Sequence, residues 1–375
     1  MLKRLYADNY RSLVNFEFFP AEQNLLLGEN GSGKSCVFEV LEGIQDIVLL
    51  GRGVAETFPS STLTRWETRD VQRFELEVEG EGGAYLYTLE VEHNRKTSAA
   101  IIRREQIDFQ GKPIFRYEAR TVHLYNDQFK EGTSFQGDSR RSFLAIVEER
   151  PENQKLMWFK RFVGSIWVFR PNPFLMTAVS KAESLWLERD GSNLASFYRA
   201  MVTENPAEVD ALKTDMREIL IGLQHFRLLS SGGTAKDLVA TLAANAVESG
   251  ARYELSIDEL SLGQRALVAL YVILHFAVPR AKVLCLDEPD NFLALREIQP
   301  WLLKLSAAIE GSRCQLILIS HHPEVIDYLA SGNAFKFERP AGDITRVRPF
   351  VLDLESGLKA SEAIARGWDN GAAEG

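Results

Sequence analysis

Eight consecutive residues, GENGSGKS at positions 28–35, match the pattern G-x-x-x-x-G-K-[S/T] of phosphate-binding loops. The glycines let the backbone turn so that successive N–H groups point at one anion. Lys34 can reach the terminal phosphates of a nucleotide, and the hydroxyl of Ser35 can ligate Mg²⁺. An apolar run precedes the loop and a helical stretch, 35–50, follows it. This strand–loop–helix context favours a phosphate-binding loop over an ordinary glycine turn.

Two acids end an apolar strand in the second half of the chain, within the sequence VLCLDEP at 283–289. Asp287, at the tip of this strand, can hold Mg²⁺ directly or through a water molecule. The next residue, Glu288, is placed to orient or deprotonate an attacking water. A purely structural alternative is that the two acids cap the following helix. Their combination with a phosphate-binding loop favours hydrolysis of a nucleotide instead.

Two further segments place polar groups at the ends of secondary-structure elements. The sequence LSLGQR at 260–265 opens a helix, so Ser261 can act as its N-cap. The hydroxyl of Ser261 and the N–H groups of the helix N-terminus also offer a second phosphate site. The sequence LILISHHP at 316–323 is another apolar strand that ends in polar residues. We expect His321 beside the strand of Asp287, where an imidazole can sense a terminal phosphate.

Together, these segments resemble the motifs of the ABC ATPase superfamily, in the family's order. GENGSGKS resembles Walker A, LSLGQ the ABC signature, LCLDEP Walker B and ISHH the switch-histidine segment, while DNFL at 290–293 stands at the D-loop position. Leu262 replaces a glycine that is common in the signature, and Gln128 and Gln136 are both candidates for the Q-loop glutamine. The resemblance implies that two heads dimerise head-to-tail, each ATP lying between the Walker motifs of one head and the signature of the other.

The resemblance also assigns expected roles to individual residues. For ATP binding these are Arg11, Gly28, Asn30, Gly31, Gly33, Lys34, Ser35, Cys36, Ser261, Gly263 and Gln264. For Mg²⁺ they are Ser35 and Asp287, and for catalysis they are Glu288 and His321.

Two other segments indicate a branch of this superfamily. The sequence DNYRSL at 8–13 resembles the start of RecF, SMC and related ATPases, in which the arginine at the position of Arg11 lies near the nucleotide. The sequence LERDGSNLA at 187–195 resembles a stretch of stand-alone prokaryotic ATPases that are often called AAA-type although they are ABC-like. Many of those are encoded beside a nuclease or another effector, and several act in anti-phage defence. Lys34 and Asp287 are also much farther apart along this chain than the matching residues of transporter ATPase domains. This spacing therefore favours a branch other than the transporters.

The composition is that of a globular protein, with 45% hydrophobic and 25% charged residues among 375. The 52 acidic and 43 basic residues give a net charge of −9, so no global field attracts nucleic acid. Local basic groups are candidates for such a contact, although solvated surface charge is the favoured interpretation of each one taken singly: Arg103-Arg104, Arg140-Arg141, Lys160-Arg161 and Arg346 with Arg348. Three cysteines give no disulfide framework, and the longest apolar stretch, 266–278, is too short to span a bilayer. We expect a cytoplasmic protein without a membrane part.

The periodicity predicts the elements that position these motifs. Strands are predicted at 2–7, 14–19 and 24–28, and an antiparallel meander at 74–79, 85–91, 101–102, 107–109, 114–117 and 122–125. Helices are predicted at 142–149, 154–163, 193–202 and 207–223, interrupted by a strand at 166–169. From 253 onward strands and helices alternate, with helices at 262–278, 293–310 and 324–330 and strands at 253–257, 282–287, 314–320 and 333–338. The end, 367–375, is predicted to fray.

We therefore expect an α/β fold, a P-loop NTPase head of the ABC-ATPase type with an antiparallel β meander, a helical insertion and no long coiled coil. Residues 1–138 form an N-terminal lobe with Walker A and the meander, and 139–250 a mainly helical insertion. Residues 251–350 form a C-terminal lobe with the signature, Walker B and the switch histidine, and 351–375 a tail.

The expected function is that of a slow, Mg²⁺-dependent ATPase that forms a homodimer on ATP and switches a partner. The expected partner is a separately encoded effector, a nuclease or similar protein, in prokaryotic anti-phage defence. The alternatives are a RecF-like ATPase of DNA repair or recombination and, from a different class, the ATPase subunit of an ABC transporter. A direct contact with nucleic acid is left open.

Overall fold

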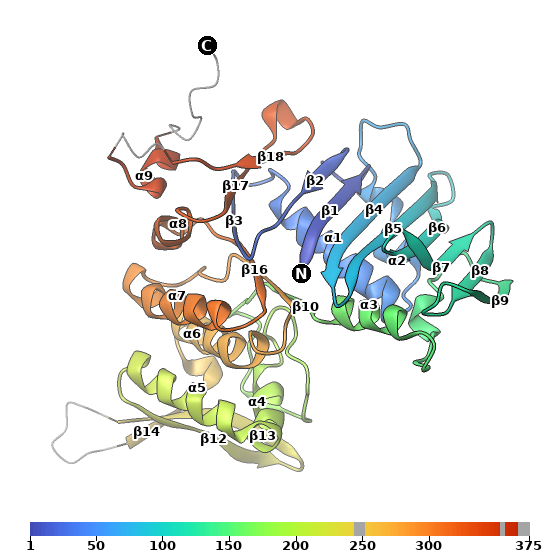
Figure 1. Ribbon diagram of the computed structural model, residues 1–375. Coiled ribbons are helices and arrows are strands. Elements are labelled where there is room, and N and C mark those ends of the chain that lie inside the picture. Colours follow the sequence, from blue (N-terminus) through green and yellow to red (C-terminus); the bar gives the residue numbers. More distant parts are fainter. Residues whose placement is uncertain (244–251, 353–356, 367–375) are drawn as a thin grey trace. The chain divides into compact units, whose positions relative to one another are not determined.

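Figure 1 shows the computed structural model of the chain, which describes residues 1–243, 252–352 and 357–366. The chain divides into two compact units. The first unit comprises residues 1–167 and 332–351, and the second comprises residues 168–331 and those from 352 onward. The phosphate-binding loop therefore belongs to the first unit, and the signature, Walker B and switch-histidine segments belong to the second.

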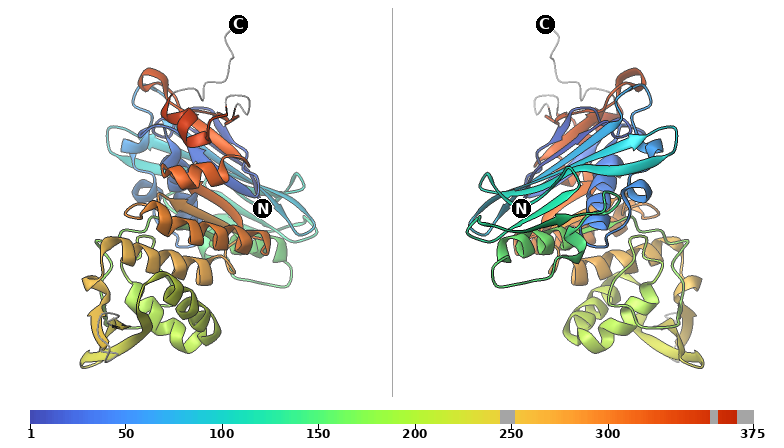
Figure 2. Two further views of the ribbon diagram at one scale, coloured as in Figure 1. Left: turned by 90° about the vertical axis from the view of Figure 1, so that its left-hand side faces the viewer. Right: turned by 90° about the vertical axis from the view of Figure 1, so that its right-hand side faces the viewer.

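An eight-stranded antiparallel sheet forms much of the first unit, with strand order β2-β1-β4-β5-β6-β7-β8-β9. Its strands are β1 (Leu2–Asp8), β2 (Phe16–Phe18), β4 (Val71–Gly80), β5 (Gly83–Asn94), β6 (Ala99–Phe109), β7 (Lys112–Glu118), β8 (Thr121–Tyr125) and β9 (Glu131–Gln136). Figures 1 and 2 show β4, β5 and β6 as long neighbouring strands. The predicted meander is confirmed, but 101–109 belongs to one strand, and the edge strand β9 is additional.

A smaller group of strands in the first unit carries the phosphate-binding loop. β3 (Gln23–Leu27) pairs in parallel with β17 (Ala334–Glu338), which pairs antiparallel with β18 (Arg346–Pro349). Helix α1 (Lys34–Val48) begins at the end of the loop and buries apolar residues at helical spacing, among them Val37, Leu41, Ile44 and Val48. It packs against α2 (Val54–Thr57) and α3 (Gln154–Gly164). A strand and a buried helix thus hold the two ends of the loop.

In the second unit, two parallel strands bring the Walker B and switch-histidine segments together. β15 (Val283–Asp287) pairs with β16 (Gln315–Ile319) in the register that places Asp287 opposite Ile319. The carboxyl ends of parallel strands lie at the same edge, so the residues that follow them are neighbours. The helices of this part are α6 (Leu262–Val272), α7 (Leu295–Glu310), α8 (Pro323–Leu329) and α9 (Ala360–Ala365). After α6, residues 273–277 continue as a π-helix.

The prediction of a mainly helical segment at 139–250 is wrong for residues 223–243. β12 (Leu223–Gly232) and β13 (Ala235–Ala243) form an antiparallel hairpin, and β13 also pairs with β11 (Val179–Ser180) and β14 (Arg252–Ser256). Gly232 and Gly233 turn the hairpin with φ of 114° and 57°, a conformation that favours glycine. Helices α4 (Leu194–Glu204) and α5 (Pro206–Ile219) contact this sheet, which gives their apolar faces a partner.

The helix predicted at 142–149 is also wrong, since the segment forms only a 3₁₀ turn at Leu144–Ile146. The Ser142 hydroxyl donates to the Glu105 carboxylate on β6 at 2.8 Å and accepts from the backbone N–H of Leu144 at 3.0 Å. These bonds hold the segment against the sheet. The strand predicted at 166–169 is β10 (Ile166–Phe169). The four-part division of the chain stays a prediction, and the fraying predicted for 367–375 lies outside the described residues.

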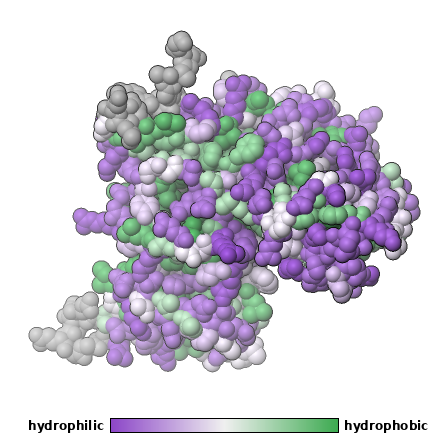
Figure 3. All heavy atoms as spheres, in the orientation of Figure 1, coloured by the Kyte–Doolittle hydropathy of each residue, from purple (hydrophilic) through white to green (hydrophobic). Residues whose placement is uncertain are grey.

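Within the described ranges, no helix is both long and apolar enough to cross a membrane. The face drawn in Figure 3 is mostly hydrophilic, with hydrophobic residues in small separate groups. A few large apolar side chains are nevertheless exposed, among them Trp66 at 46% and Trp186 at 68%. Isolated exposed apolar residues are normal on a protein surface.

Candidate functional site

The backbone of the phosphate-binding loop requires glycine at three positions. Gly28, Gly31 and Gly33 have φ of 141°, 80° and 101°, conformations that other residues rarely adopt. A Cβ atom at Gly28 would lie 2.2 Å from the carbonyl oxygen of Phe337 on β17. At Gly33 it would lie 2.4 Å from Oγ1 of Thr345. The loop therefore turns sharply, and it packs closely against β17 and the segment that follows it.

Lys34 is buried in this loop, with only 5% of its surface exposed. Its ammonium donates hydrogen bonds to the carbonyl oxygens of Gly28 at 2.6 Å and Glu29 at 3.0 Å. Asn30 and Ser35 are exposed beside it, Ser35 in the first turn of α1. A glycine loop, a lysine and a helix N-terminus form a donor set that fits the phosphates of a nucleotide, and an exposed serine hydroxyl next to them fits Mg²⁺.

Thr345 supports the phosphate-binding loop, although no sequence pattern identified it as a site residue. Its hydroxyl lies 2.9 Å from the carbonyl oxygen of Ser32, to which it donates, and 2.8 Å from the hydroxyl of Ser12. Thr345, Ser12 and Ser32 are all buried. Residues more than 300 positions apart along the chain thus fix the shape of the loop.

Arg11 lies beside the beginning of α1, where a nucleotide-contacting residue is expected. Its guanidinium is 3.0 Å from a carboxylate oxygen of Glu39, which also accepts a hydrogen bond from the Tyr10 hydroxyl at 3.0 Å. Burial raises the pKa of the nearby Cys36 thiol to about 11, and Glu39 adds to the rise, while the charges of Arg11 and Arg339 oppose it. Cys36 is therefore a neutral thiol at physiological pH, and its contribution to phosphate binding would come from its backbone N–H.

In the second unit, the structure brings Glu288 and His321 together. The backbone N–H of Glu288 donates to the carbonyl of Ile319 at 2.9 Å, and Nε2 of His321 lies 3.8 Å from Oε1 of Glu288. The side-chain amide of Asn291 donates to Oε2 of Glu288 at 3.0 Å. Glu288 has φ of 47°, an unusual conformation for glutamate. Both side chains remain partly exposed.

Sequence reasoning did not identify Arg170, which contacts the Walker B aspartate. Nε of Arg170 donates to Oδ2 of Asp287 at 2.8 Å, and the carboxylate is nearly buried. The backbone N–H of Arg170 donates to the carbonyl of Arg189, within the stretch 187–195. One signal was available in the sequence, because Arg170 directly follows the apolar strand 166–169, as Asp287 ends its own strand.

Nearby, Asp290 is buried, and its carboxylate accepts a hydrogen bond from the Ser320 hydroxyl at 2.9 Å. Burial raises the pKa of this carboxyl, and the bond from Ser320 opposes the rise. Ser320 also accepts a hydrogen bond from the backbone N–H of His322 at 3.0 Å. The buried pair Asp290–Ser320 thereby ties the D-loop position to the switch-histidine segment.

The signature segment forms the N-terminus of α6. Ser261 is the N-cap: its hydroxyl accepts from the backbone N–H of Gln264 at 3.2 Å, and the Gln264 side chain accepts from the N–H of Ser261 at 3.0 Å. The structural interpretation of Ser261 is thus correct, and Gln264 completes a capping box. A Cβ atom at Gly263 would lie 2.9 Å from the carbonyl oxygen of Phe292. The glycine therefore permits close contact between the signature and the D-loop position.

The two Q-loop candidates lie at the β8–β9 end of the large sheet. Gln136 donates from its side chain to the hydroxyl of Thr121 at 3.2 Å, and Gln128 lies in the turn between β8 and β9. Their assignment stays a prediction. Among the described residues, no group of three or more His, Cys, Asp or Glu is arranged to hold a metal ion.

The basic pairs of the 139–250 segment are largely engaged within the chain. Arg140 pairs with Asp138 at 3.1 Å and Arg161 with Glu149 at 3.2 Å. Lys160 is half-buried, donates to the carbonyl of Val147 at 2.9 Å and has a pKa lowered by burial. Lys160 is therefore a weaker candidate for a nucleic-acid contact than an exposed lysine, and only part of this basic charge is available to a partner.

Residues 24–327, most of the chain, match the family described as "AAA domain, putative AbiEii toxin, Type IV TA system". The chain belongs to this AAA-domain family. None of the curated proteins matches its sequence significantly.

Solved structures show the fold of this AAA-domain family member. It is similar to an SMC head crystallised with the C-winged helix domain of ScpA, with a TM-score of 0.59 and 15% identity over 95% of this chain and 99% of that one. It is also similar to an SMC head with an extended coiled coil, bound to the C-terminal domain of ScpA derived from Pyrococcus furiosus, with a TM-score of 0.53 and 12% identity over 97% and 99%. The predicted P-loop ATPase head is confirmed, and the longest helix in the described ranges, α7, has only 16 residues.

Proposed function

We propose that this chain is a slow ATPase that binds ATP with Mg²⁺ and works as a molecular switch. The observation that carries the proposal is the loop 28–35, whose glycines, buried Lys34 and close packing form a ready-made phosphate cradle. Membership of an AAA-domain family and the SMC-head fold support it. In this proposal Lys34 neutralises the terminal phosphates, and Arg11 contacts the nucleotide beside α1.

Ser35 and Asp287 would hold Mg²⁺, which when bound draws charge from the phosphates and makes them easier to attack. Glu288 would take a proton from the attacking water, and Asn291 orients its carboxylate. His321, next to Glu288, would contact the terminal phosphate. The Arg170 contact would fix the direction of the Asp287 carboxylate.

We also propose that ATP joins two copies head-to-tail through the signature. Replacing Ser261 by Arg is expected to leave ATP binding by the monomer intact and to block the ATP-dependent dimer, because a bulky cation would stand where the partner's nucleotide docks. Light scattering with ATP measures the dimer. Ser261→Asn is the matched control, since Asn is a good N-cap of modest size, and it should still dimerise. If the Arg variant dimerises as readily as the wild type, the signature does not lie at the interface.

The switch is proposed to act on a separately encoded effector, in a defence or toxin–antitoxin context. The family description mentions a toxin and a type IV toxin–antitoxin system, and two similar SMC heads were crystallised with domains of a partner, ScpA. A RecF-like repair ATPase remains the alternative, because the start of the chain resembles RecF as well as SMC proteins. A transporter subunit is the weaker alternative, because Lys34 and Asp287 are much farther apart along this chain than the matching residues of transporter ATPase domains.

This switch proposal predicts that the purified chain does not cleave nucleic acid. Incubation of the protein with DNA or RNA, ATP and Mg²⁺ should yield no cleavage beyond that of the Lys34→Ala variant. Co-purification of the chain with proteins encoded beside it should retain one partner at 0.5 M salt, where a purely electrostatic contact with nucleic acid is strongly weakened. Robust cleavage by the isolated chain that depends on Lys34 would overturn the proposal.

A further inference from the structure

Trp66 presents an exposed indole in the loop that leads into β4. Its side chain is 46% exposed, and the guanidinium carbon of Arg339 lies 5.5 Å from the centre of its ring. A guanidinium at this distance is attracted to the electron-rich face of an indole. Trp66 and Arg339 therefore form a small flat surface that carries a positive charge.

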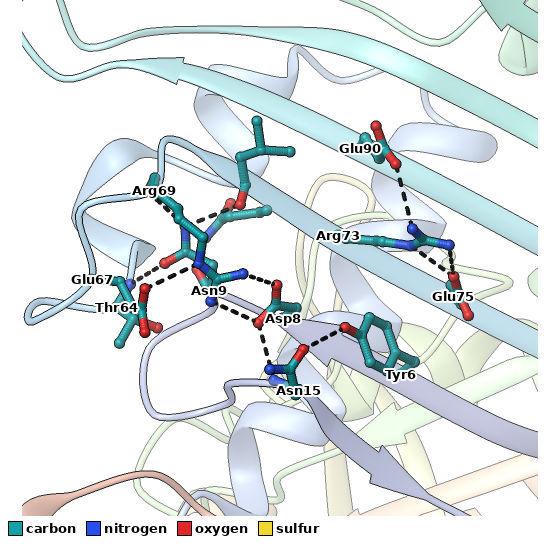
Figure 4. Close-up of polar contacts among 12 residues, drawn as sticks. Tyr6, Asp8, Asn9, Asn15, Thr64, Glu67, Arg69, Arg73, Glu75 and Glu90 are labelled. Carbon is teal, nitrogen blue, oxygen red and sulfur yellow. Dashed lines mark hydrogen bonds and ion pairs between the residues drawn. The ribbon is translucent and has the colours of Figure 1, made fainter.

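The loop that carries Trp66 is fixed by buried polar groups. Asn9 is fully buried with φ of 58°, and its side chain accepts from the N–H of Thr64 at 3.2 Å and donates to the carbonyl of Arg69 at 2.8 Å. Arg69 in turn donates to both carboxylate oxygens of Asp8, at 2.6 and 3.1 Å. Figure 4 shows these contacts among Asp8, Asn9, Thr64 and Arg69. An aromatic ring on such a fixed loop loses little entropy on binding a ligand.

Arg339 is held equally firmly and belongs to the segment behind the phosphate-binding loop. Its guanidinium donates to the carbonyl oxygens of Asp343 at 2.8 Å and Gly342 at 2.9 Å. A few residues further on, Thr345 packs over Gly33 and donates to the carbonyl of Ser32. Arg339, the second residue of this surface, therefore belongs to a segment that packs directly against the phosphate-binding loop.

One hydrogen bond and one electrostatic effect relate this surface to the beginning of α1. The backbone N–H of Arg11 donates to the carbonyl of Thr62 at 2.6 Å, which joins the Trp66 loop to the residue beside Glu39 on α1. The charges of Arg11 and Arg339 both act on Cys36, in the first turn of that helix. In a loop of this kind the lysine reaches the β- and γ-phosphates and the backbone cradles the α- and β-phosphates. The nucleoside consequently extends away from Lys34.

We propose that Trp66, backed by Arg339, stacks on the base of the nucleotide held by the phosphate-binding loop. This inference rests on the proposed nucleotide binding and adds a recognition element to it. Trp66 contributes the flat apolar surface, and Arg339 adds its positive charge to the stack. Stacking depends on ring area, so the surface should favour purine over pyrimidine nucleotides.

Equilibrium binding of ATP and of inorganic tripolyphosphate to the full chain tests the proposal. Trp66→Ala is expected to weaken ATP binding about 5- to 150-fold, the effect of losing one base–aromatic stack. Tripolyphosphate has no base, so its affinity should not change. Trp66→Phe should keep most of the ATP affinity, and Arg339→Ala should give a smaller loss than Trp66→Ala. Trp186→Ala, which removes a more exposed tryptophan of the second unit, is the matched control and should have no effect.

The two ligands separate the ways in which the inference could fail. Equal weakening of ATP and tripolyphosphate by Trp66→Ala would mean that Trp66 only supports the cradle, and unchanged ATP affinity would mean that it does not meet the base. Either result overturns the stacking proposal and leaves nucleotide binding intact. If the wild-type chain binds neither ligand, the proposed nucleotide binding is wrong, and the stacking proposal that rests on it is wrong as well.

Discussion

Replacing Glu288 by Gln should preserve ATP binding and slow ATP hydrolysis by about 100-fold or more, the scale of a lost general base. Gln has the same length as Glu and keeps one oxygen that can accept the hydrogen bond from Asn291. The backbone bond from residue 288 to Ile319 does not involve the side chain. The variant therefore loses the basic carboxylate next to His321 with little other change, and it should accumulate as an ATP-bound dimer.

Phosphate release at saturating ATP measures the rate, and binding of a fluorescent ATP analogue measures the affinity. Glu310→Gln is the matched control, because Glu310 is an exposed glutamate at the last turn of α7 in the same unit. Turnover of the Glu288→Gln variant at the wild-type rate would show that another residue activates the water. Loss of binding together with turnover would instead assign Glu288 a role in holding the nucleotide.

Lys34→Ala is expected to abolish ATP binding in practice, with an affinity lower by about 100-fold or more. Two contacts of a charged donor with phosphate oxygens contribute about 3–6 kcal/mol in total, which corresponds to that range or more. The change also removes the buried ammonium that holds the carbonyls of Gly28 and Glu29. Circular dichroism and the melting temperature must therefore accompany the binding measurement.

The matched control for Lys34→Ala is Lys130→Ala, since Lys130 is an exposed lysine of the same unit. This variant should bind ATP like the wild type. An unchanged ATP affinity in a folded Lys34→Ala variant would contradict the assignment of the loop. Lys34→Ala and Glu288→Gln together separate ATP binding from ATP hydrolysis. Lys34→Ala should lose both, and Glu288→Gln should lose only hydrolysis.

Short contiguous motifs could be interpreted from the sequence because their geometry is local. In GENGSGKS the glycines, the lysine and the helix start follow one another, so backbone conformation alone brings the donors together. The same holds for Ser261, whose capping box spans four residues. The position of His321 beside the strand of Asp287 was also predicted from the sequence. Both segments follow apolar strands, and neighbouring parallel strands end at the same edge.

Features that depend on long-range packing could not be predicted. The β12–β13 hairpin had a local signal in Gly232-Gly233, but its residues obtain their partners from β11 and β14. The segment 142–149 has helical periodicity, yet one bond from Ser142 to the buried Glu105 of β6 holds it in another conformation. A tertiary hydrogen bond in the interior outweighs a weak helical preference, because removing one of the two hydroxyl partners of a buried carboxylate, the other being Tyr87, costs more than a few residues of helix gain.

By itself, the sequence determined that this protein has a phosphate-binding loop, two acids at a strand end and a histidine after the next strand, in the order of an ABC-type ATPase head. Only the tertiary structure showed which residues support them, Thr345 next to Gly33 and Arg170 on Asp287, and that Arg339 lies over the ring of Trp66. The physical reason is the distance along the chain. Arg170 and Asp287 are 117 residues apart, and no periodicity or spacing relates two such positions until strands and helices have packed.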